Sequence, residues 1–269
     1  MSSYKPVTAA LRVLDILAAV NRANPRATVG EVHRQTGIDK ATIVRMLETL
    51  VHAGYVIRDK ASTSYQVSGK TLQLSNSYDR HSVIASLIEE DLTAFRQRIG
   101  WPSDVAILDN DAMLVIKSSR QGEPLSFNRK PGYRAPVLGT SLGLAYLAFC
   151  PLQEREAVIA RALDETGPWN EIARSPQMLA AKLDLVREQG YATMDENYSR
   201  IEYDNRILSI GVPIKAGTTV MASINVIYLT SALTPAKARE TLLAPLQAVA
   251  AHMADTLAAK GGLSGSVPR

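Results

Sequence analysis

Apolar residues near the start of the chain recur at helical spacing. Segment 8–21 carries four of them three positions apart, namely Leu11, Leu14, Leu17 and Val20. This spacing predicts an amphipathic helix. Thr28 followed by Glu31 is the capping-box pattern, so a second, short helix is expected over 29–35, and Gly37 is expected to end it.

A third helix is expected over 40–53, capped by Asp39. Its inward face carries apolar residues at i, i+3, i+4 and i+7: Ile43, Met46, Leu47 and Leu50. Two short helices joined through a glycine turn form the helix-turn-helix pattern. The strand-like segments 55–58 and 64–67 flank a polar loop and add a wing. A winged helix-turn-helix domain is therefore expected over residues 1–77.

Segment 78–99 has the pattern of one longer helix. Its apolar stripe consists of Ile84, Leu87, Ile88, Leu92, Phe95 and Ile99. The sequence Gly100-Trp101-Pro102 is expected to stop it. Because the stripe needs a partner surface, we expect this helix to link two domains and to help dimerise the chain.

The rest of the chain mixes strands and helices. Strands are predicted at 104–108, 113–117, 125–127, 207–215 and 220–229, and helices at 141–149, 153–163, 177–189 and 235–259. The two late strands are joined across Ala216-Gly217-Thr218, so they are expected to be adjacent. The pattern predicts an α+β domain over 100–260, followed by a disordered tail at 261–269.

Charge is unevenly distributed along the chain. Residues 1–80 hold 11 Lys and Arg against 6 Asp and Glu, whereas residues 81–269 hold 19 against 20. The excess positive charge therefore lies in the predicted helix-turn-helix region, which is typical of a DNA-binding module joined to a nearly neutral second domain.

Other features of the composition narrow the function classes. No apolar run reaches the roughly 18–20 residues that span a bilayer, so no membrane association is expected. Cys150 is the single cysteine, which excludes an internal disulfide and favours the cytoplasm. The four histidines are scattered, so neither a metal site nor a cofactor is expected.

The outward face of the third helix supplies the candidate DNA contacts. Arg45 suits a guanine edge in the major groove, and Lys40 and Thr42 suit phosphates. The full set of candidates is Thr28, Lys40, Ala41, Thr42, Arg45, Arg58 and Lys60, the last two on the wing. The alternative for any one of them is a solvated polar surface.

Two consecutive segments carry a family resemblance. GIDKATIVRMLETLVHAGYVIRD, preceded by TVGEVHRQT, resembles the winged helix-turn-helix of the isocitrate-lyase-regulator (IclR) family of transcription regulators, which typically has S-K-S-T-x-x-R-L-L-x-T-L here. Asp39 and Ala41 depart from that pattern, and both departures are expected to alter phosphate contacts. The resemblance covers about residues 8–258. It implies a GAF-like C-terminal domain, with an antiparallel sheet flanked by helices, and a homodimer or tetramer.

Further segments are similar to family members that regulate aromatic-acid degradation. They are WPSDVAILDNDAMLV, LGTSLGLAYLAFCP and INVIYLTSALT. The resemblance implies a ligand-responsive regulator that binds double-stranded operator DNA and senses a small aromatic carboxylate.

Strand alternation indicates where that effector binds. Period two places Ser209 and Asn225 on one face of the two late strands, with Met221 and Ile227 as apolar neighbours. The alternative is a sheet face open to solvent. The small residues in 139–143 expose N–H groups at a helix N-terminus, which suits a carboxylate.

The resemblance adds further effector residues. Ser141 and Leu142 match the family's Gly-Ala pair, and Asp195 matches an acidic pocket position. The candidate effector residues are Ser141, Leu142, Asp195, Ser209, Asn225 and Ile227. Arg129 and Arg134 are candidates for an additional positive charge.

A hydrolase is the main rival interpretation. Segment 139–143 matches G-x-S-x-G, with Ser141 as nucleophile, Asp195 or Asp204 as the acid and His252 as the base. The upstream strands lack βα alternation, no HGGG-like motif is present, and His252 falls inside a predicted helix, so an enzyme is not expected. A DNA-binding architectural protein without ligand is a third class, against which the size of the second domain argues.

Overall fold

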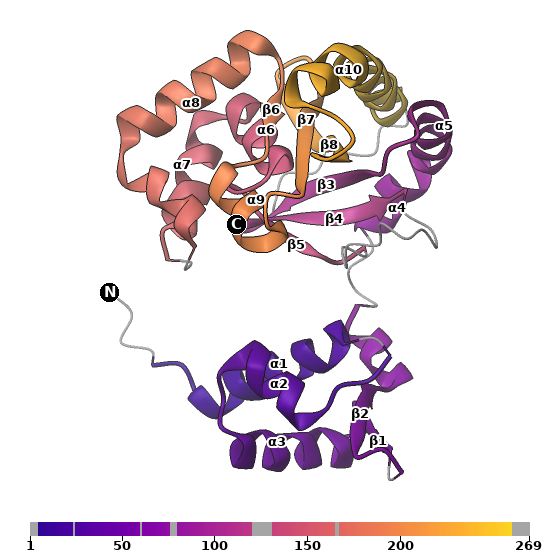
Figure 1. Ribbon diagram of the computed structural model, residues 1–269, viewed down its shortest axis with the longest axis vertical. Coiled ribbons are helices and arrows are strands. Elements are labelled where there is room, and N and C mark those ends of the chain that lie inside the picture. Colours follow the sequence, from indigo (N-terminus) through magenta and orange to yellow (C-terminus); the bar gives the residue numbers. More distant parts are fainter. Residues whose placement is uncertain are drawn as a thin grey trace. The chain divides into compact units, whose positions relative to one another are not determined.

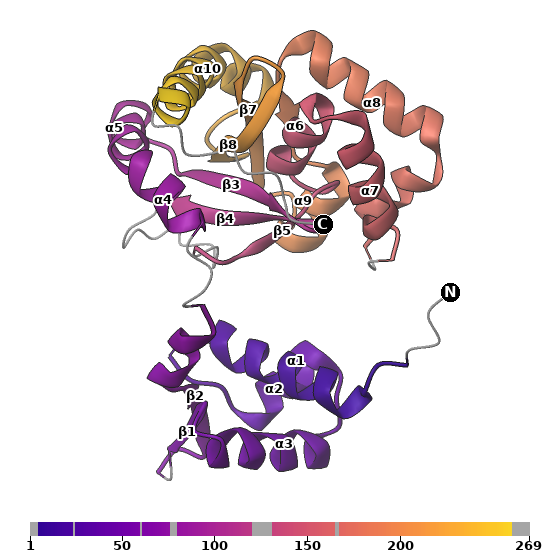
Figure 2. The same cartoon turned by 180° about the vertical axis from the view of Figure 1, so that it is seen from behind.

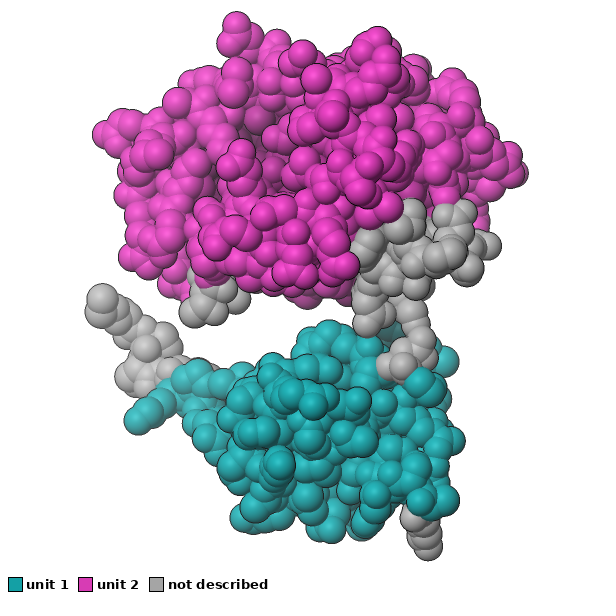
Figure 3. Space-filling model, viewed as in Figure 1, with its two compact units in different colours: residues 1–79 teal, residues 80–269 magenta. Residues whose placement is uncertain are grey.

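The computed structural model describes residues 5–23, 25–59, 61–75, 80–119, 131–164 and 167–259. The chain divides into two compact units, unit 1 at residues 1–79 and unit 2 at residues 80–269 (Figure 3). The predicted strand 125–127 and the predicted tail 261–269 lie outside the described residues. Among the described residues, no helix is both long enough and apolar enough to cross a membrane.

In the described part of unit 1, three α-helices are followed by a two-stranded hairpin and a 3-10 helix (Figure 1). Its elements are α1 (Thr8–Arg22), α2 (Val29–Thr36), α3 (Lys40–His52), β1 (Val56–Asp59), β2 (Ser64–Val67) and the 3-10 helix η1 (Gly69–Ser75). The residues predicted to cap and to end the second helix do so in the structure. Thr28 and Glu31 form a complete capping box, and Gly37 ends α2 in the left-handed conformation.

The face that α1 buries differs from the prediction. Ile16, Ala19 and Val20 are buried, whereas Leu11 and Leu14 are 50% and 61% exposed. At about 100° per residue, residues nine positions apart lie on roughly opposite sides of a helix. A stripe at a constant spacing of three therefore winds around the helix, and only its C-terminal part reaches the core.

Within its described residues, unit 2 is built on a six-stranded antiparallel sheet in the order β5-β4-β3-β8-β7-β6, which confirms the predicted α+β class. The strands are β3 (Ser103–Asp109), β4 (Ala112–Ser118), β5 (Arg134–Pro136), β6 (Ala192–Thr193), β7 (Ile207–Ala216) and β8 (Thr219–Leu229). The short strands β5 and β6 were not predicted, because two or three residues carry no readable alternation.

Helices cover both faces of this sheet (Figures 1 and 2). One face packs against α4 (Arg80–Leu87), α5 (Glu89–Ile99) and α10 (Pro235–Ala259). The other face packs against α6 (Ser141–Phe149), α7 (Leu152–Ala162) and α8 (Pro176–Gln189). The 3-10 helix η2 (Pro168–Arg174) and helix α9 (Glu196–Tyr203) flank the second layer.

The predicted single helix at 78–99 is broken at Ile88, whose φ of −102° and ψ of 0° separate α4 from α5. Its apolar stripe is nevertheless buried as predicted: Ile84, Ile88, Leu92 and Phe95 join the core of unit 2. The stripe therefore finds its partner surface within the same chain. The expectation that this stripe helps to dimerise the chain is therefore not supported.

Alternation in β7 follows the prediction, but that in β8 shifts once. Ile210, Val212 and Ile214 pack toward α10. Ile214 pairs with Ala222 and Lys215 pairs with Val220, so Met221 is an extra residue in β8. Such a bulge reverses the alternation. Met221 consequently packs toward α10, and the prediction that it lines the effector side was wrong.

Candidate functional site

Helix α3 presents a polar face to the outside of unit 1. Lys40, Ala41 and Arg45 are exposed and Thr42 is half-buried, whereas Ile43, Leu47 and Leu50 are buried in the core. The sequence therefore assigned the inward and outward sides of this helix correctly. The Asp39 carboxylate caps α3 by accepting a hydrogen bond from the Thr42 N–H at 2.9 Å.

Thr28 uses its donors within its own capping box. Its backbone N–H and its hydroxyl donate to Glu31 Oε2 at 2.7 and 2.9 Å. These two hydrogen bonds hold the pKa of Glu31 below its ordinary value of 4.5. A phosphate contact from Thr28, which the sequence suggested, would have to replace a carboxylate that is already bound there.

The wing is tied to the segment that precedes α2. Ala27 and Tyr65 exchange backbone hydrogen bonds of 2.8 Å, and Arg26 forms an ion pair with Asp59. Arg58 is exposed on β1, with its guanidinium carbon 5.9 Å from the centroid of the Tyr65 ring. Lys60, the other predicted wing contact, lies outside the described residues.

In unit 2, the N-terminus of α6 lies directly against β7. The hydroxyls of Ser141 and Ser209 are hydrogen-bonded at 2.7 Å, and both residues are buried. A Cβ at Gly211 would lie 2.5 Å from the carbonyl oxygen of Ser141. Only glycine allows this approach, so the structure brings two predicted effector residues into contact. The alternative of a solvent-facing sheet surface is excluded.

Asn225 is fully buried on the same sheet face. Its Oδ1 accepts a hydrogen bond from the Asp104 N–H at 2.9 Å. Its Nδ2, like the Ser223 hydroxyl, has no hydrogen-bond partner among the described residues. Strand periodicity also places Ser223 on the face of Asn225, but Ser223 was not among the predicted effector residues. Asp104 could not be found in that way, because its role depends on the pairing of β3 with β8.

Asp195 has a structural role in the geometry observed. Its Oδ1 caps α9 by accepting from the N–H groups of Asn197 and Tyr198, and its Oδ2 accepts from Lys182 Nζ at 2.9 Å. The carboxylate predicted for the pocket is therefore bound at both oxygens.

The two predicted apolar walls belong to different clusters. Leu142 is buried in the large core beneath α6. Ile227 packs instead with Met194, Tyr198 and Ile207 in a small separate cluster. The structure therefore does not place both side chains in a single apolar group.

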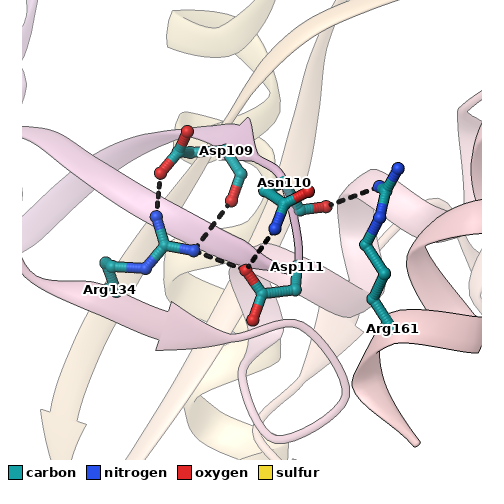
Figure 4. Close-up of polar contacts among 5 residues, drawn as sticks. All are labelled: Asp109, Asn110, Asp111, Arg134 and Arg161. Atoms are coloured by element: carbon teal, nitrogen blue, oxygen red, sulfur yellow. Dashed lines mark hydrogen bonds and ion pairs between the residues drawn. The ribbon is translucent and has the colours of Figure 1, made fainter. Parts of the chain in front are cut away.

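Arg134 is bound to two carboxylates. Its guanidinium contacts Asp109 and Asp111 in the turn between β3 and β4, while Arg161 donates to the carbonyl of Asn110 (Figure 4). Two carboxylates around one guanidinium leave no net positive charge for an anionic ligand. Arg134 therefore does not supply the additional cation suggested by the sequence, and Arg129 lies outside the described residues.

The geometry gives no support to the hydrolase interpretation. Ser141 is fully buried and bound to Ser209, while the Nε2 atom of His252 on α10 lies 3.3 Å from Asp91 on α5. The helices α5 and α10 pack on the sheet face opposite α6. The proposed nucleophile and base are therefore on different sides of the sheet.

Each unit of the chain matches the model of a known protein family. Residues 9–60 match the IclR helix-turn-helix domain, and residues 76–254 match the bacterial transcriptional regulator IclR C-terminal domain. Together they define a transcriptional regulator with a DNA-binding helix-turn-helix and a ligand-binding C-terminal domain. The chain belongs to the IclR family, whose members are regulators rather than enzymes.

Individual relatives are more distant. The Pca regulon regulatory protein of Pseudomonas putida is 28% identical over 82% of this chain and 74% of its own length. Thermotoga maritima IclR superposes with a TM-score of 0.64 at 20% identity, covering 93% of this chain and 98% of that one. An IclR homologue from Microbacterium hydrocarbonoxydans in complex with 4-hydroxybenzoate also has a TM-score of 0.64, at 18% identity, covering 93% and 99%. At these identities the solved structures establish the fold alone.

Proposed function

We propose that this regulator binds operator DNA through α3 and the wing, and that unit 2 senses a small aromatic carboxylic acid. In this proposal the protein controls an operon for the catabolism of an aromatic compound. Arg45 reads a base edge in the major groove. Lys40 and Thr42, which flank Ala41, contact DNA phosphates. Arg58 and Lys60 on the wing contact the DNA backbone or the minor groove.

The observation that carries the effector site is a buried polar group with unused hydrogen-bonding capacity. Asn225 Nδ2 lacks a partner among the described residues, and Asn225 lies on the same sheet face as Ser209. Leaving a buried donor unpaired is costly, so such groups call for a partner such as a ligand. The N-terminus of α6 adds a local positive potential that favours a carboxylate.

The aromatic class rests on relatives. One structural neighbour binds 4-hydroxybenzoate, which is a hydroxylated aromatic acid. The chain also resembles the activator of hydroxyphenylpropionate catabolism in the segments around Trp101, Leu138 and Ile224, which supports the same ligand class.

A thermal-shift panel provides that test. Hydroxylated phenylpropionates, benzoates and phthalates, their neutral amides, and aliphatic acids of similar size are compared. A ligand at a hundredfold excess over its dissociation constant should stabilise the folded state by about 2.7 kcal/mol. The acid should raise the melting temperature, and its amide should raise it much less. The effector class is wrong if only aliphatic acids produce a shift.

Two substitutions test the location of the pocket. Ser209→Val and Asn225→Leu should each abolish the shift caused by the acid, whereas Thr219→Val, at the exposed start of β8, should leave it unchanged. A normal response in both pocket variants would place the effector elsewhere in unit 2.

A further inference from the structure

The N-terminus of the outward-facing helix α3 carries a negative charge. Asp39 is exposed, and hydrogen bonds from the hydroxyl and backbone N–H of Thr42 hold its pKa below the ordinary value of 3.8. The carboxyl group is therefore ionised at neutral pH. Lys40 follows it directly, and Arg45 lies further along the same helix.

A carboxylate at this position changes what the helix can bind. Free N–H groups at a helix N-terminus form a ready site for phosphate. In this chain Asp39 occupies the N-terminus of α3, and Glu31 does the same for α2 through Thr28. Both helices of the helix-turn-helix thus carry a carboxylate at the end that ordinarily attracts phosphate, so phosphate contacts there depend on neighbouring side chains such as Lys40.

The Asp39 carboxylate also keeps capacity to accept hydrogen bonds. It has two oxygens with about four acceptor sites, and Thr42 uses part of them through its N–H, which donates to Oδ1, and its hydroxyl. In the major groove, cytosine presents an amino group that suits an Asp or Glu acceptor, whereas Asn pairs with adenine. The N-terminal residues of such a helix are the ones that reach base edges.

We propose that Asp39 is a specificity-determining residue, which accepts a hydrogen bond from a cytosine amino group in the operator and repels phosphate on other DNA. This rests on the DNA-binding role of α3 proposed above. On the matching sequence the hydrogen bond offsets the repulsion. On other sequences the repulsion remains, so binding to unrelated DNA is weakened selectively.

Asp39→Asn in the full-length protein is the decisive variant, because Asn caps a helix about as well as Asp but carries no charge. Glu188→Gln is the matched control, since it changes the net charge equally at an exposed position of α8 in unit 2. Affinity for a random-sequence duplex is measured at several salt concentrations. Asp39→Asn should bind the random duplex about 3- to 10-fold more tightly than wild type. The slope of log affinity against log salt concentration should become steeper by up to about one. The control variant should match wild type in both measurements.

Selection from a random duplex pool tests the base contact. Wild-type protein should enrich cytosine at one position of each half-site, and Asp39→Asn should shift that position toward adenine. The proposal is overturned if the consensus is unchanged or if binding to the random duplex tightens no more than in the control. Asp39→Ser keeps a capping hydroxyl and should tighten binding to the random duplex in the same way. Agreement between the two variants shows that the effect does not come from a folding defect in one of them.

Failure of this inference can be distinguished from failure of the DNA-binding proposal. If Lys40→Ala and Arg45→Ala weaken binding while Asp39→Asn changes nothing, only the role of Asp39 is wrong. If the wild-type protein binds neither the random duplex nor any selected sequence, both proposals fall together.

Discussion

At the scale of single residues, hydrogen bonds within the chain decide which groups remain for DNA. Thr28 and Thr42 were both candidates for phosphate contacts. Thr28 donates to Glu31, and the Thr42 N–H donates to Asp39. Arg45 is exposed and carries a planar guanidinium that can bind a guanine edge with two hydrogen bonds. It is therefore the residue of α3 whose loss should cost most.

Replacing Arg45 by Ala should weaken binding to a selected operator by about 1–3 kcal/mol and relax the preference at one base pair. Lys40→Ala should weaken all sequences by similar factors, because a phosphate contact carries no base information. Fluorescence anisotropy with matched and mismatched duplexes measures both effects. An Arg45→Ala protein that still distinguishes its operator normally would contradict the proposed orientation of α3.

Gly143 is a second residue on which geometry places a strict limit. A Cβ there would lie 2.1 Å from the carbonyl oxygen of Val137, which is backbone and cannot move aside easily. Gly143→Ala should destabilise unit 2 by about 1–3 kcal/mol or more through overpacking. Gly30→Ala on α2 is the comparison, since its nearest neighbour would be 3.9 Å away. Chemical denaturation should show a loss for the first variant and none for the second.

At the scale of elements, close contacts and caps fix how the helices are seated. Helix α6 packs against β7 through Gly211 and the Ser141–Ser209 hydrogen bond. An ionised carboxylate caps α3 at Asp39 and another lies in the first turn of α2 at Glu31, and the hydrogen bonds from Thr28 and Thr42 lower the pKa values of Glu31 and Asp39. The stability of these helices should therefore depend on pH.

A carboxyl group whose pKa is lowered by folding contributes stability that is fully present above its unfolded pKa. That contribution is lost as the pH falls through the folded value. Unit 1 should therefore lose stability below about pH 4.5, the ordinary pKa of Glu31. Glu31→Gln should lose less on acidification than wild type, as followed by circular dichroism melting of the protein between about pH 6 and pH 3. Identical acid sensitivity of both proteins would contradict a role for the cap.

At the scale of the whole molecule, an uncovered apolar stripe remains on unit 1. Leu11 and Leu14 are exposed on α1, three residues apart, and Val7, the residue just before the helix, is exposed as well. We propose that the homodimer or tetramer implied by the family resemblance accounts for this exposure, because two copies can bury these side chains against each other. The apolar stripe on α4 and α5 is buried within unit 2, so it is not available for an interface between copies of the chain.

The double substitution Leu11→Ser and Leu14→Ser should shift the protein toward smaller oligomers. It should also weaken binding to a two-half-site operator more than to a single half-site. Light scattering during gel filtration measures the first effect. Met178→Ser is the control, since Met178 on α8 is 64% exposed, as compared with 61% for Leu14. An unchanged molar mass in the double variant would remove α1 from the oligomer interface.

The sequence predicted features that depend on neighbours along the chain. The caps at Thr28 and Asp39, the inward face of α3 and the alternation around Ser209 all follow from local geometry and from burial with a fixed period. The helix-turn-helix, the adjacency of β7 and β8, and the placement of Ser209 and Asn225 on one sheet face were therefore accessible without a structure.

Tertiary structure decided the features in which distant segments compete for the same group. Asp195 has the acidic chemistry expected of a pocket, but Lys182 and the N-terminus of α9 bind its carboxylate. Arg134 is bound in the same way by Asp109 and Asp111. The break at Ile88, the bulge at Met221 and the exposed side of α1 likewise depend on which surfaces meet. A pattern along one segment specifies which side chains are apolar or charged, but only packing determines which partner each of them meets.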